Sequence, residues 1–197
     1  GAPLHLTKHV EAVVVNAGDG THEHPTQALL DMMSLQEKLG AIEGLKVGIV
    51  GDISHSRVAG SNILGLQKMG AEVTLCGPRT MMPWGVEKLG VAVNHNLDEV
   101  LDWADAVNVL RIQRERLGVN YFPSVREYRH LFGVTRERIE RLKKQLIIMH
   151  PGPMNRGVEI DSDVADSENA IILDQVLNGV AIRMAVLYLL LGDKPEE

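Results

Sequence analysis

The chain has 197 residues, of which 45% are hydrophobic and 23% are charged, and its formal net charge is -6 at pH 7. This composition predicts a soluble globular protein with one good core and room for segments of a second domain. The negative charge excludes a general attraction to nucleic acid or to anionic membranes, so local arginines must hold any anionic ligand. The single cysteine, Cys76, excludes an internal disulfide and a multi-cysteine zinc site. We expect no metal, no cofactor and a cytoplasmic location.

The first residues predict a short strand, a turn and a helix. The apolar run Val13–Val15 is typical of a strand and is far too short for the core of a signal peptide. Residues 18–20, Gly-Asp-Gly, predict a tight turn, because these residues tolerate the backbone angles that such a turn requires. Pro25 suits the first position of a helix, which we expect to extend to about Leu39.

Apolar strands and helices alternate along the rest of the chain. The expected strands are residues 45–50, 71–76, 91–94, 105–110 and 146–149, and the expected helices are residues 57–69, 97–103 and 175–191. This alternation predicts a doubly wound, mainly parallel α/β sheet with helices on both faces. The charged segment 111–144 is expected to form a solvated helical face and a loop. The apolar run 180–191 contains Arg183 and is shorter than the ~20 residues needed to cross a bilayer, so we expect a packed helix.

The helix that begins at Pro25 is preceded by His24 and carries Gln27 in its first turn. Unpaired amides and the helix dipole at such a start favour a negative charge or a developing oxyanion. A histidine and a carboxamide there can polarise a small carbonyl group. Each residue alone is equally typical of an ordinary helix start with an exposed or capping histidine. The ordered string His-Pro-Thr-Gln is more specific than its parts.

Two arginines follow expected strands. Arg57 ends the motif Gly-Asp-Ile-Ser-His-Ser-Arg, and Arg111 begins Arg-Ile-Gln-Arg-Glu-Arg. Ligands of such sheets bind at the carboxyl ends of the strands, where a guanidinium group can fork onto a carboxylate. On an extended chain Arg111 and Gln113 point to the same side. Two such clamps beside His24 predict a dicarboxylate site, which aspartate would fit. Alone, either arginine is also typical of a solvated surface, and no G-x-G-x-x-G pattern supports nucleotide binding.

The strand at residues 146–149 leads into His150-Pro-Gly-Pro153. The prolines lack backbone donors and stiffen the turn, which leaves carbonyl groups free to accept hydrogen bonds from an amide. A rigid turn without a binding role is the alternative for this segment.

Together these motifs resemble those of the transcarbamoylases over nearly the whole chain, and most closely those of aspartate transcarbamoylase. The resemblance implies transfer of a carbamoyl group from carbamoyl phosphate to the amine of L-aspartate, a step of pyrimidine biosynthesis. The substrate contacts that it implies are His24, Gln27, Gly152 and Pro153 for carbamoyl phosphate, and Arg57, Arg111 and Gln113 for aspartate.

The resemblance also assigns individual roles. His24 would be the catalytic contact to the carbamoyl oxygen, and Gln27 would help to hold the carbamoyl amide. Arg57 would bind the α-carboxylate of aspartate, while Arg111 and Gln113 would bind its β-carboxylate.

The same resemblance implies a domain organisation. Residues 1–24 would be a remnant strand and loop of a carbamoyl-phosphate domain, 25–39 a hinge helix, 40–170 the aspartate-binding domain, and 171–197 a helix that returns towards the carbamoyl-phosphate domain. The family's Ser-Thr-Arg-Thr-type phosphate loop does not occur in the sequence, so we expect the rest of that domain to be missing. Expected partners are such a domain, a homotrimer of complete chains, and regulatory or dihydroorotase chains, with no nucleic acid or membrane.

Two alternatives to this function remain open. The chain could be a non-catalytic fragment or pseudoenzyme module that binds a dicarboxylate or a partner chain, or it could be an ornithine-type transcarbamoylase. The ornithine enzymes typically carry a cysteine in His-Pro-Cys-Gln and another after the histidine of the last motif. Here those positions hold Thr26 and Pro151, which favours the aspartate branch.

Overall fold

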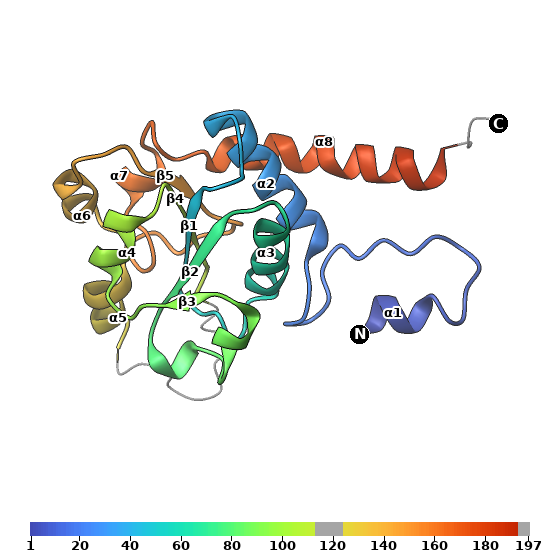
Figure 1. Cartoon of the computed structure of the whole chain (residues 1–197), viewed down its shortest axis with the longest axis horizontal. Coiled ribbons are helices and arrows are strands. Elements are labelled where there is room, and N and C mark those ends of the chain that lie inside the picture. The colour runs from blue at the N-terminus through green and yellow to red at the C-terminus, as the bar shows by residue number, and fades with distance from the viewer. Residues whose placement is uncertain (113–123, 193–197) are drawn as a thin grey trace.

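A computed structural model of the chain describes residues 1–112 and 124–192. At its centre lies a five-stranded sheet with the strand order β3-β2-β1-β4-β5, in which each pair of neighbours runs parallel (Figure 1). The strands are β1 (Lys46–Val50), β2 (Glu72–Cys76), β3 (Ala92–Val93), β4 (Ala106–Val109) and β5 (Ile147–Met149). The predicted doubly wound α/β fold is thereby confirmed.

The described residues contain eight α-helices and two short 3-10 helices. The α-helices are α1 (Ala2–Leu6), α2 (Pro25–Leu39), α3 (Arg57–Lys68), α4 (Leu97–Trp103), α5 (Val125–Phe132), α6 (Arg136–Arg141), α7 (Ser162–Ala165) and α8 (Ile172–Leu191). The 3-10 helices are η1 (Arg79–Met81) and η2 (Val86–Leu89). The predicted bounds of α2 and α4 agree with the structure, while α8 begins three residues before its predicted start.

Each face of the sheet buries its own apolar cluster. Val47 and Ile49 of β1 belong to a cluster that includes Leu35 of α2 and Ile63 of α3. Val50 of the same strand belongs to the cluster on the other face, with residues of α4 and α5. Successive strand residues point to opposite faces, so a nearly continuous apolar strand can supply both clusters. This explains why β1, β2 and β4 are apolar without an alternating polar face.

The strand order places a crevice at the carboxyl edge of the sheet. From β1 the chain moves outward through β2 to β3, then crosses to β4 on the other side of β1 and continues to β5. The connections after β1 and β4 therefore leave the sheet in opposite directions. In parallel sheets the gap between two such connections is the usual position of a ligand site. Residues that directly follow β1, β4 and β5 should meet there.

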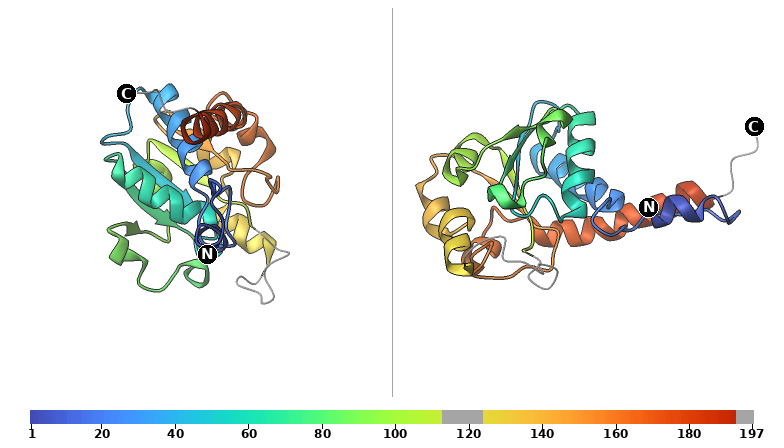
Figure 2. Two further views of the ribbon diagram at one scale, coloured as in Figure 1. Left: turned by 90° about the vertical axis from the view of Figure 1, so that its right-hand side faces the viewer. Right: turned by 90° about the horizontal axis from the view of Figure 1, so that it is seen from below.

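Helix α8 is only partly packed. Its first half is buried against α2 through Ile172, Gln175 and Asn178, whereas Tyr188 and Leu191 are 78% and 63% exposed. The second half extends away from the sheet, to the same side as α1, in Figure 1 and in the right-hand view of Figure 2. The prediction of a packed helix is therefore correct for the first half alone.

By length and composition α8 could cross a membrane, since its 20 residues have a mean hydropathy of 1.4. Such a helix is weak support for a span, because an interface helix of a globular protein passes the same test. The buried, hydrogen-bonded Gln175 and Asn178 show that the first half belongs to the protein core.

The N-terminal residues differ from the prediction. Val13–Val15 form no strand; they are irregular and partly or largely exposed, and the short helix α1 precedes them. A strand needs a neighbour to satisfy its backbone groups, and none lies beside these residues in the described part of the chain.

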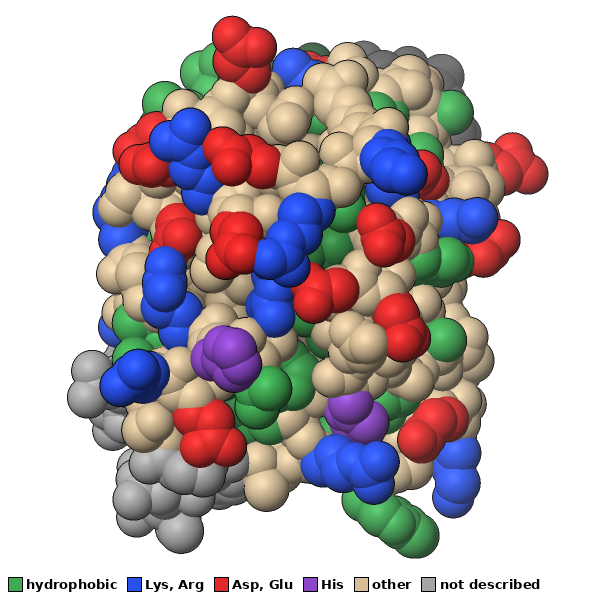
Figure 3. Space-filling view, turned by 90° about the vertical axis from the view of Figure 1, so that its left-hand side faces the viewer, with side chains coloured by type: hydrophobic (Ala, Val, Ile, Leu, Met, Phe, Trp, Pro, Cys, Tyr) green, Lys and Arg blue, Asp and Glu red, His purple; other side chains and the backbone are tan. Residues whose placement is uncertain are grey.

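The charged segment after β4 forms the two helices α5 and α6 in its described part. Figure 3 shows basic and acidic side chains interspersed over the face of the molecule on which α4, α5 and α6 lie. Ion pairs join Arg129 to Asp161 at 2.6 Å and Arg136 to Glu140 at 2.6 Å. The expected solvated helical face is thus present here, without a single-sign charged patch.

Candidate active site

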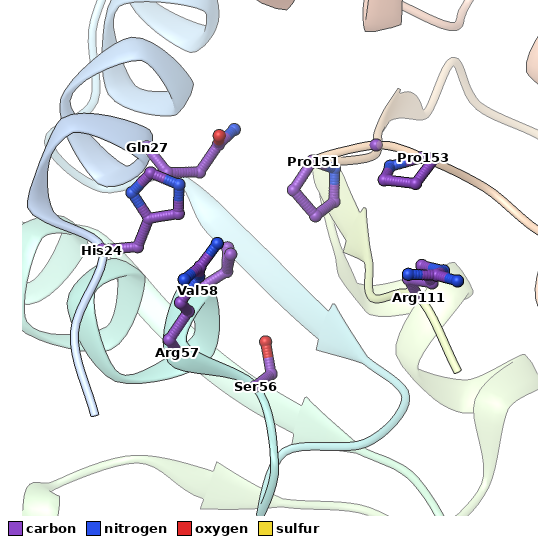
Figure 4. A pocket seen from close by; sticks show the side chains of 9 residues that line it. His24, Gln27, Ser56, Arg57, Val58, Arg111, Pro151 and Pro153 are labelled. Atoms are coloured by element: carbon purple, nitrogen blue, oxygen red, sulfur yellow. The ribbon is translucent and has the colours of Figure 1, made fainter. Parts of the chain in front are cut away.

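A cleft of about 160 Å³ opens at the carboxyl edge of the sheet, where the strand order places a site (Figure 4). Its lining residues come from the start of α2, the start of α3 and the segments that follow β4 and β5: they are His24, Gln27, Ser56, Arg57, Val58, Arg111, Pro151, Gly152 and Pro153. Six of the seven predicted contact residues are in this set. The seventh, Gln113, lies outside the described residues.

Helix α2 holds one wall of the cleft. His24 is the residue before its first turn, and the backbone carbonyl of His24 accepts hydrogen bonds from the N–H groups of Gln27 and Ala28 at 3.0 and 3.2 Å. The backbone N–H of His24 donates to Ser61 Oγ of α3 at 2.8 Å. The imidazole makes no capping hydrogen bond to α2. The backbone contacts and a 3.5 Å contact between His24 Nδ1 and Thr26 Oγ1 therefore hold the ring at the cleft, and the alternative role as a side-chain cap has no support in the geometry.

The His24 imidazole is neutral at physiological pH. Its partial burial lowers its pKa to about 4, and the positive charges of Arg57 and Arg183 act in the same direction. A neutral imidazole keeps one N–H donor, which can polarise a carbonyl oxygen without carrying a charge.

Arg57 lies at the start of α3 directly opposite a glycine turn. Ser56 caps this helix by accepting a hydrogen bond from the N–H of Ala59 at 3.3 Å. A Cβ atom at Gly18 would lie 2.7 Å from Arg57 Cζ, so the guanidinium group packs directly on the glycine backbone. Gly18 also has φ +132°, which side chains rarely adopt. The predicted 18–20 turn thus makes room for a cleft residue.

The opposite wall contains Arg111, Pro151 and Pro153 (Figure 4). The turn that follows β5 is fixed by His150, which is buried. Its backbone N–H donates to Gln175 Oε1 at 3.0 Å, and its Nδ1 accepts from the Gly152 N–H at 2.9 Å. Because Nδ1 accepts, the ring proton is on Nε2, which lies 3.4 Å from the buried Glu159 carboxylate. His150 therefore supports the turn and does not line this cleft.

A buried carboxylate, which no motif in the sequence indicated, lies behind the cleft. Asp31 of α2 is fully buried, and its oxygens accept hydrogen bonds from four side-chain amides: Gln27 at 2.9 Å, Gln175 at 2.7 Å, Asn62 at 2.8 Å and Asn108 at 2.9 Å. Burial raises the pKa of Asp31, and the four donors oppose that shift. Polar residues at apolar positions, such as Asn108 in Ala-Val-Asn-Val, were the available signal.

Arg156, which follows the His-Pro-Gly-Pro turn in the sequence, does not line the cleft. Its guanidinium group makes a two-point contact with Asp166, with both distances 2.7 Å. In residues 1–112 and 124–192 no cluster of three or more His, Cys, Asp or Glu side chains could hold a metal ion.

A doubly wound parallel sheet with two arginines and a neutral imidazole at its switch point defines an α/β domain suited to a small anionic ligand. The chain belongs to the aspartate/ornithine carbamoyltransferase family: the family model for the Asp/Orn binding domain matches residues 43–190. The family model for the carbamoyl-P binding domain matches residues 1–37. This second match corrects the expectation that only a remnant at residues 1–24 belongs to the carbamoyl-phosphate domain and that the domain is otherwise missing, since the matched segment extends to residue 37 and includes most of α2.

Individual relatives agree with this assignment. The aspartate carbamoyltransferase catalytic subunit of Christiangramia forsetii is 62% identical over 190 residues, which are 96% of this chain and 61% of the relative. The solved catalytic subunit of M. jannaschii aspartate transcarbamoylase is 34% identical with a TM-score of 0.82, over 100% of this chain and 65% of that one. Ornithine carbamoyltransferase from Pyrococcus furiosus is 29% identical with a TM-score of 0.80, over 96% of this chain and 63% of that one. The chain thus spans about 61% of the length of its curated relatives.

Proposed function

We propose that this chain supplies the aspartate-binding part of an aspartate carbamoyltransferase. The observation that carries the proposal is the cleft at the switch point, where Arg57 and Arg111 lie with His24 and Gln27 between the starts of two helices. The high identity to subunits named aspartate carbamoyltransferase supports aspartate over ornithine. Thr26 and Pro151, in place of the cysteines typical of ornithine enzymes, favour the same choice.

In the proposed reaction the aspartate amine attacks the carbamoyl carbon, the bond from that carbon to the phosphate oxygen breaks, and the amine loses a proton. Arg57 binds the α-carboxylate, and Arg111 with Gln113 binds the β-carboxylate, which holds the amine in position. The neutral His24 donates its N–H to the carbamoyl oxygen, where negative charge develops. Gln27, Gly152 and Pro153 hold the carbamoyl amide. No covalent intermediate with the protein is needed.

The proposed domain roles follow the same reasoning. Residues 1–24 and the hinge helix 25–39 connect a carbamoyl-phosphate domain to the aspartate-binding domain at 40–170, and residues 171–197 return towards the first domain. The exposed second half of α8 supports this return, because an apolar helix face of this size is typical of an interface. We propose a cytoplasmic homotrimer for the complete protein.

The test uses a fusion protein in which this chain is joined to the part of the Christiangramia forsetii subunit that it does not match. This full-length fusion is called the extended chain. Arg57→Ala and Arg111→Ala should each lower kcat/KM for aspartate by roughly 10- to 150-fold, the equivalent of a lost charge-assisted hydrogen bond. Arg156→Ala is the matched control, because its partner is Asp166 outside the cleft, and it should change kcat/KM by less than about 3-fold.

Three outcomes would count against the proposal. Equal effects of the three substitutions would show that Arg57 and Arg111 do not bind the substrate carboxylates. Transfer to L-ornithine in preference to L-aspartate would favour the ornithine-type enzyme. A folded extended chain that binds a dicarboxylate but forms no carbamoyl-aspartate would favour the non-catalytic module.

A further inference from the structure

Asp31 has an unusual set of contacts for a carboxylate in a protein core. It is 0% exposed, and each of its two oxygens accepts two amide N–H groups. Gln27 and Gln175 donate to Oδ1, and Asn62 and Asn108 donate to Oδ2. The donors come from four elements, α2, α3, β4 and α8. All partners of this group are donors, which suits an ionised carboxylate because it can only accept.

This arrangement restricts the orientation of one cleft residue. The Gln27 carboxamide has two orientations, which exchange its nitrogen and its oxygen. With Nε2 against Asp31 the hydrogen bond of 2.9 Å forms, whereas the reverse orientation would place two oxygen acceptors together. Among the described residues no group donates to Gln27 Oε1. Gln27 lines the cleft, so its oxygen is the atom available to a ligand there.

Asp31 also reaches the opposite wall. Gln175 donates to Asp31 at 2.7 Å and accepts, with Oε1, the backbone N–H of His150 at 3.0 Å. His150 is the residue at which the turn formed by residues 151–153 begins. One buried carboxylate therefore connects Gln27 on the α2 wall with the backbone of the wall after β5.

We propose that Asp31 is a positioning residue that presents the Gln27 carboxamide as a hydrogen-bond acceptor, and thereby makes the site select acyl phosphates that carry an N–H group. A carbamoyl group can donate an amide hydrogen to Gln27 Oε1, whereas the acetyl group of similar size presents a methyl group to the same atom. This inference rests on the proposed function for the identity of the transferred group. The orientation of Gln27 by Asp31 does not depend on it.

The first experiment measures that orientation in the 197-residue chain itself. Hydrogen exchange of the Gln27 side-chain amide, followed by NMR, should be slow in the wild type because one N–H is bonded to a buried carboxylate. Asp31→Ala should speed this exchange by at least about 10-fold. Exchange at the rate of a solvent-exposed carboxamide in the wild type would overturn the proposal, and this holds even if Asp31→Ala does not fold.

The second experiment measures selectivity in the extended chain. Asp31→Ala should raise the KM of carbamoyl phosphate by roughly 5- to 10-fold, about one hydrogen bond, and change the inhibition constant of acetyl phosphate by less than about 2-fold. Gln27→Ala should act in the same way, and the double variant should show no further loss. General damage to the fold would instead weaken the binding of both acyl phosphates.

Asn178→Ala is the matched control. Asn178 joins α8 to α2, as the contact between Gln175 and Asp31 does, through Ser34 at 3.0 Å and Glu37 at 2.7 Å, but among the described residues it makes no hydrogen bond to Gln27 or His150. Asn178→Ala should lower the stability of the protein and leave unchanged the ratio of the KM of carbamoyl phosphate to the inhibition constant of acetyl phosphate. A folded Asp31→Ala or Gln27→Ala variant with the wild-type ratio would overturn the proposal. A wild-type extended chain without carbamoyl transfer would instead overturn the proposed function, and the exchange experiment would still decide the role of Asp31.

Discussion

At the scale of single residues, the His24 imidazole shows how its surroundings set a chemical state. The sequence indicates a histidine at a helix start but does not indicate its protonation. In the structure, burial first and the charges of Arg57 and Arg183 second lower its pKa to about 4. A group that stays neutral near pH 7 can donate a hydrogen bond throughout a reaction in which the substrate oxygen gains charge.

An NMR titration of the 197-residue chain tests this state directly. The His24 ring should titrate near pH 4, and Arg57→Ala should raise its pKa part of the way towards 6.5, because burial is the larger cause and remains. A wild-type His24 pKa near 6.5 would contradict the described environment.

The same shift predicts a direction for stability. The folded-state pKa is below the unfolded value of 6.5, so the unfolded chain binds more protons between about pH 6.5 and pH 4. The contribution of His24 to stability is therefore fully present above pH 6.5 and is lost as the pH falls towards 4. Thermal melts of wild type and His24→Ala should consequently converge as the pH is lowered through this window.

At the scale of elements, the contact between β1 and α4 depends on a glycine in a strand. A Cβ atom at Gly48 would lie 2.9 Å from Val100 Cγ1 of α4 and 3.1 Å from Val107 Cγ1 of β4. The strand is completely covered here, so neighbouring side chains have little room to move. The sequence Lys-Val-Gly-Ile-Val thus contains glycine because α4 approaches the sheet closely at this point.

We expect Gly48→Ala to lower the free energy of unfolding by about 1–3 kcal/mol through overpacking. Urea denaturation should show a lower midpoint with an unchanged slope. Leu64→Ala is the control: Leu64 of α3 is 54% exposed, so its replacement should change stability by less than about 0.5 kcal/mol. A Gly48→Ala protein as stable as the control would mean that α4 can shift away without cost.

Helix α8 combines two environments in one element. Its first half is tied to α2 by Gln175 and Asn178, and its second half presents Leu187, Tyr188 and Leu191 to solvent. Local stability follows the number of buried contacts. Backbone amides of residues 175–180 should therefore exchange slowly and those of residues 186–191 quickly in the 197-residue chain.

In the extended chain, residues 186–191 should become protected as well, if this half returns to the carbamoyl-phosphate domain as proposed. Hydrogen-exchange mass spectrometry of both chains provides the measurement. If residues 186–191 still exchange quickly in the extended chain, the second half of α8 does not form the proposed interface.

At the scale of the whole molecule, the cleft corresponds to one part of the two-substrate site that we propose. In that proposal its lining residues bind a dicarboxylate and a carbamoyl group, while a Ser-Thr-Arg string for phosphate binding does not occur in the sequence. The chain also covers only 61% of the length of its Christiangramia forsetii relative. We therefore propose that a phosphorylated substrate is bound with the help of groups from the part of the relatives that this chain does not match.

We expect the 197-residue chain alone to form little or no carbamoyl-aspartate, and the extended chain to form it readily. The assay is carbamoyl-aspartate formation at equal concentrations of folded protein, with the folded fraction taken from thermal melts. Robust turnover by the 197-residue chain alone would show that phosphate is bound by residues already present.

Much of this protein is determined by local sequence. The apolar runs at β1, β2, β4 and β5 and the helix signal at Pro25 define these elements, because each depends on side chains close in the chain. The parallel sheet follows from their alternation, and the cleft position follows from the rule for the carboxyl ends of strands. The predicted strand at Val13–Val15 is wrong because a strand also depends on a neighbour.

Only the tertiary structure decides the contacts between distant residues. The Asp31 carboxylate meets Asn108 and Gln175, which are 77 and 144 residues away in the chain, and no local pattern connects them. The neutral state of His24 likewise depends first on its burial and then on the charges of Arg57 and Arg183 from two other helices. Burial and charge act through space, so the chemical state of the cleft is fixed by the packing of α2, α3 and α8 around the sheet.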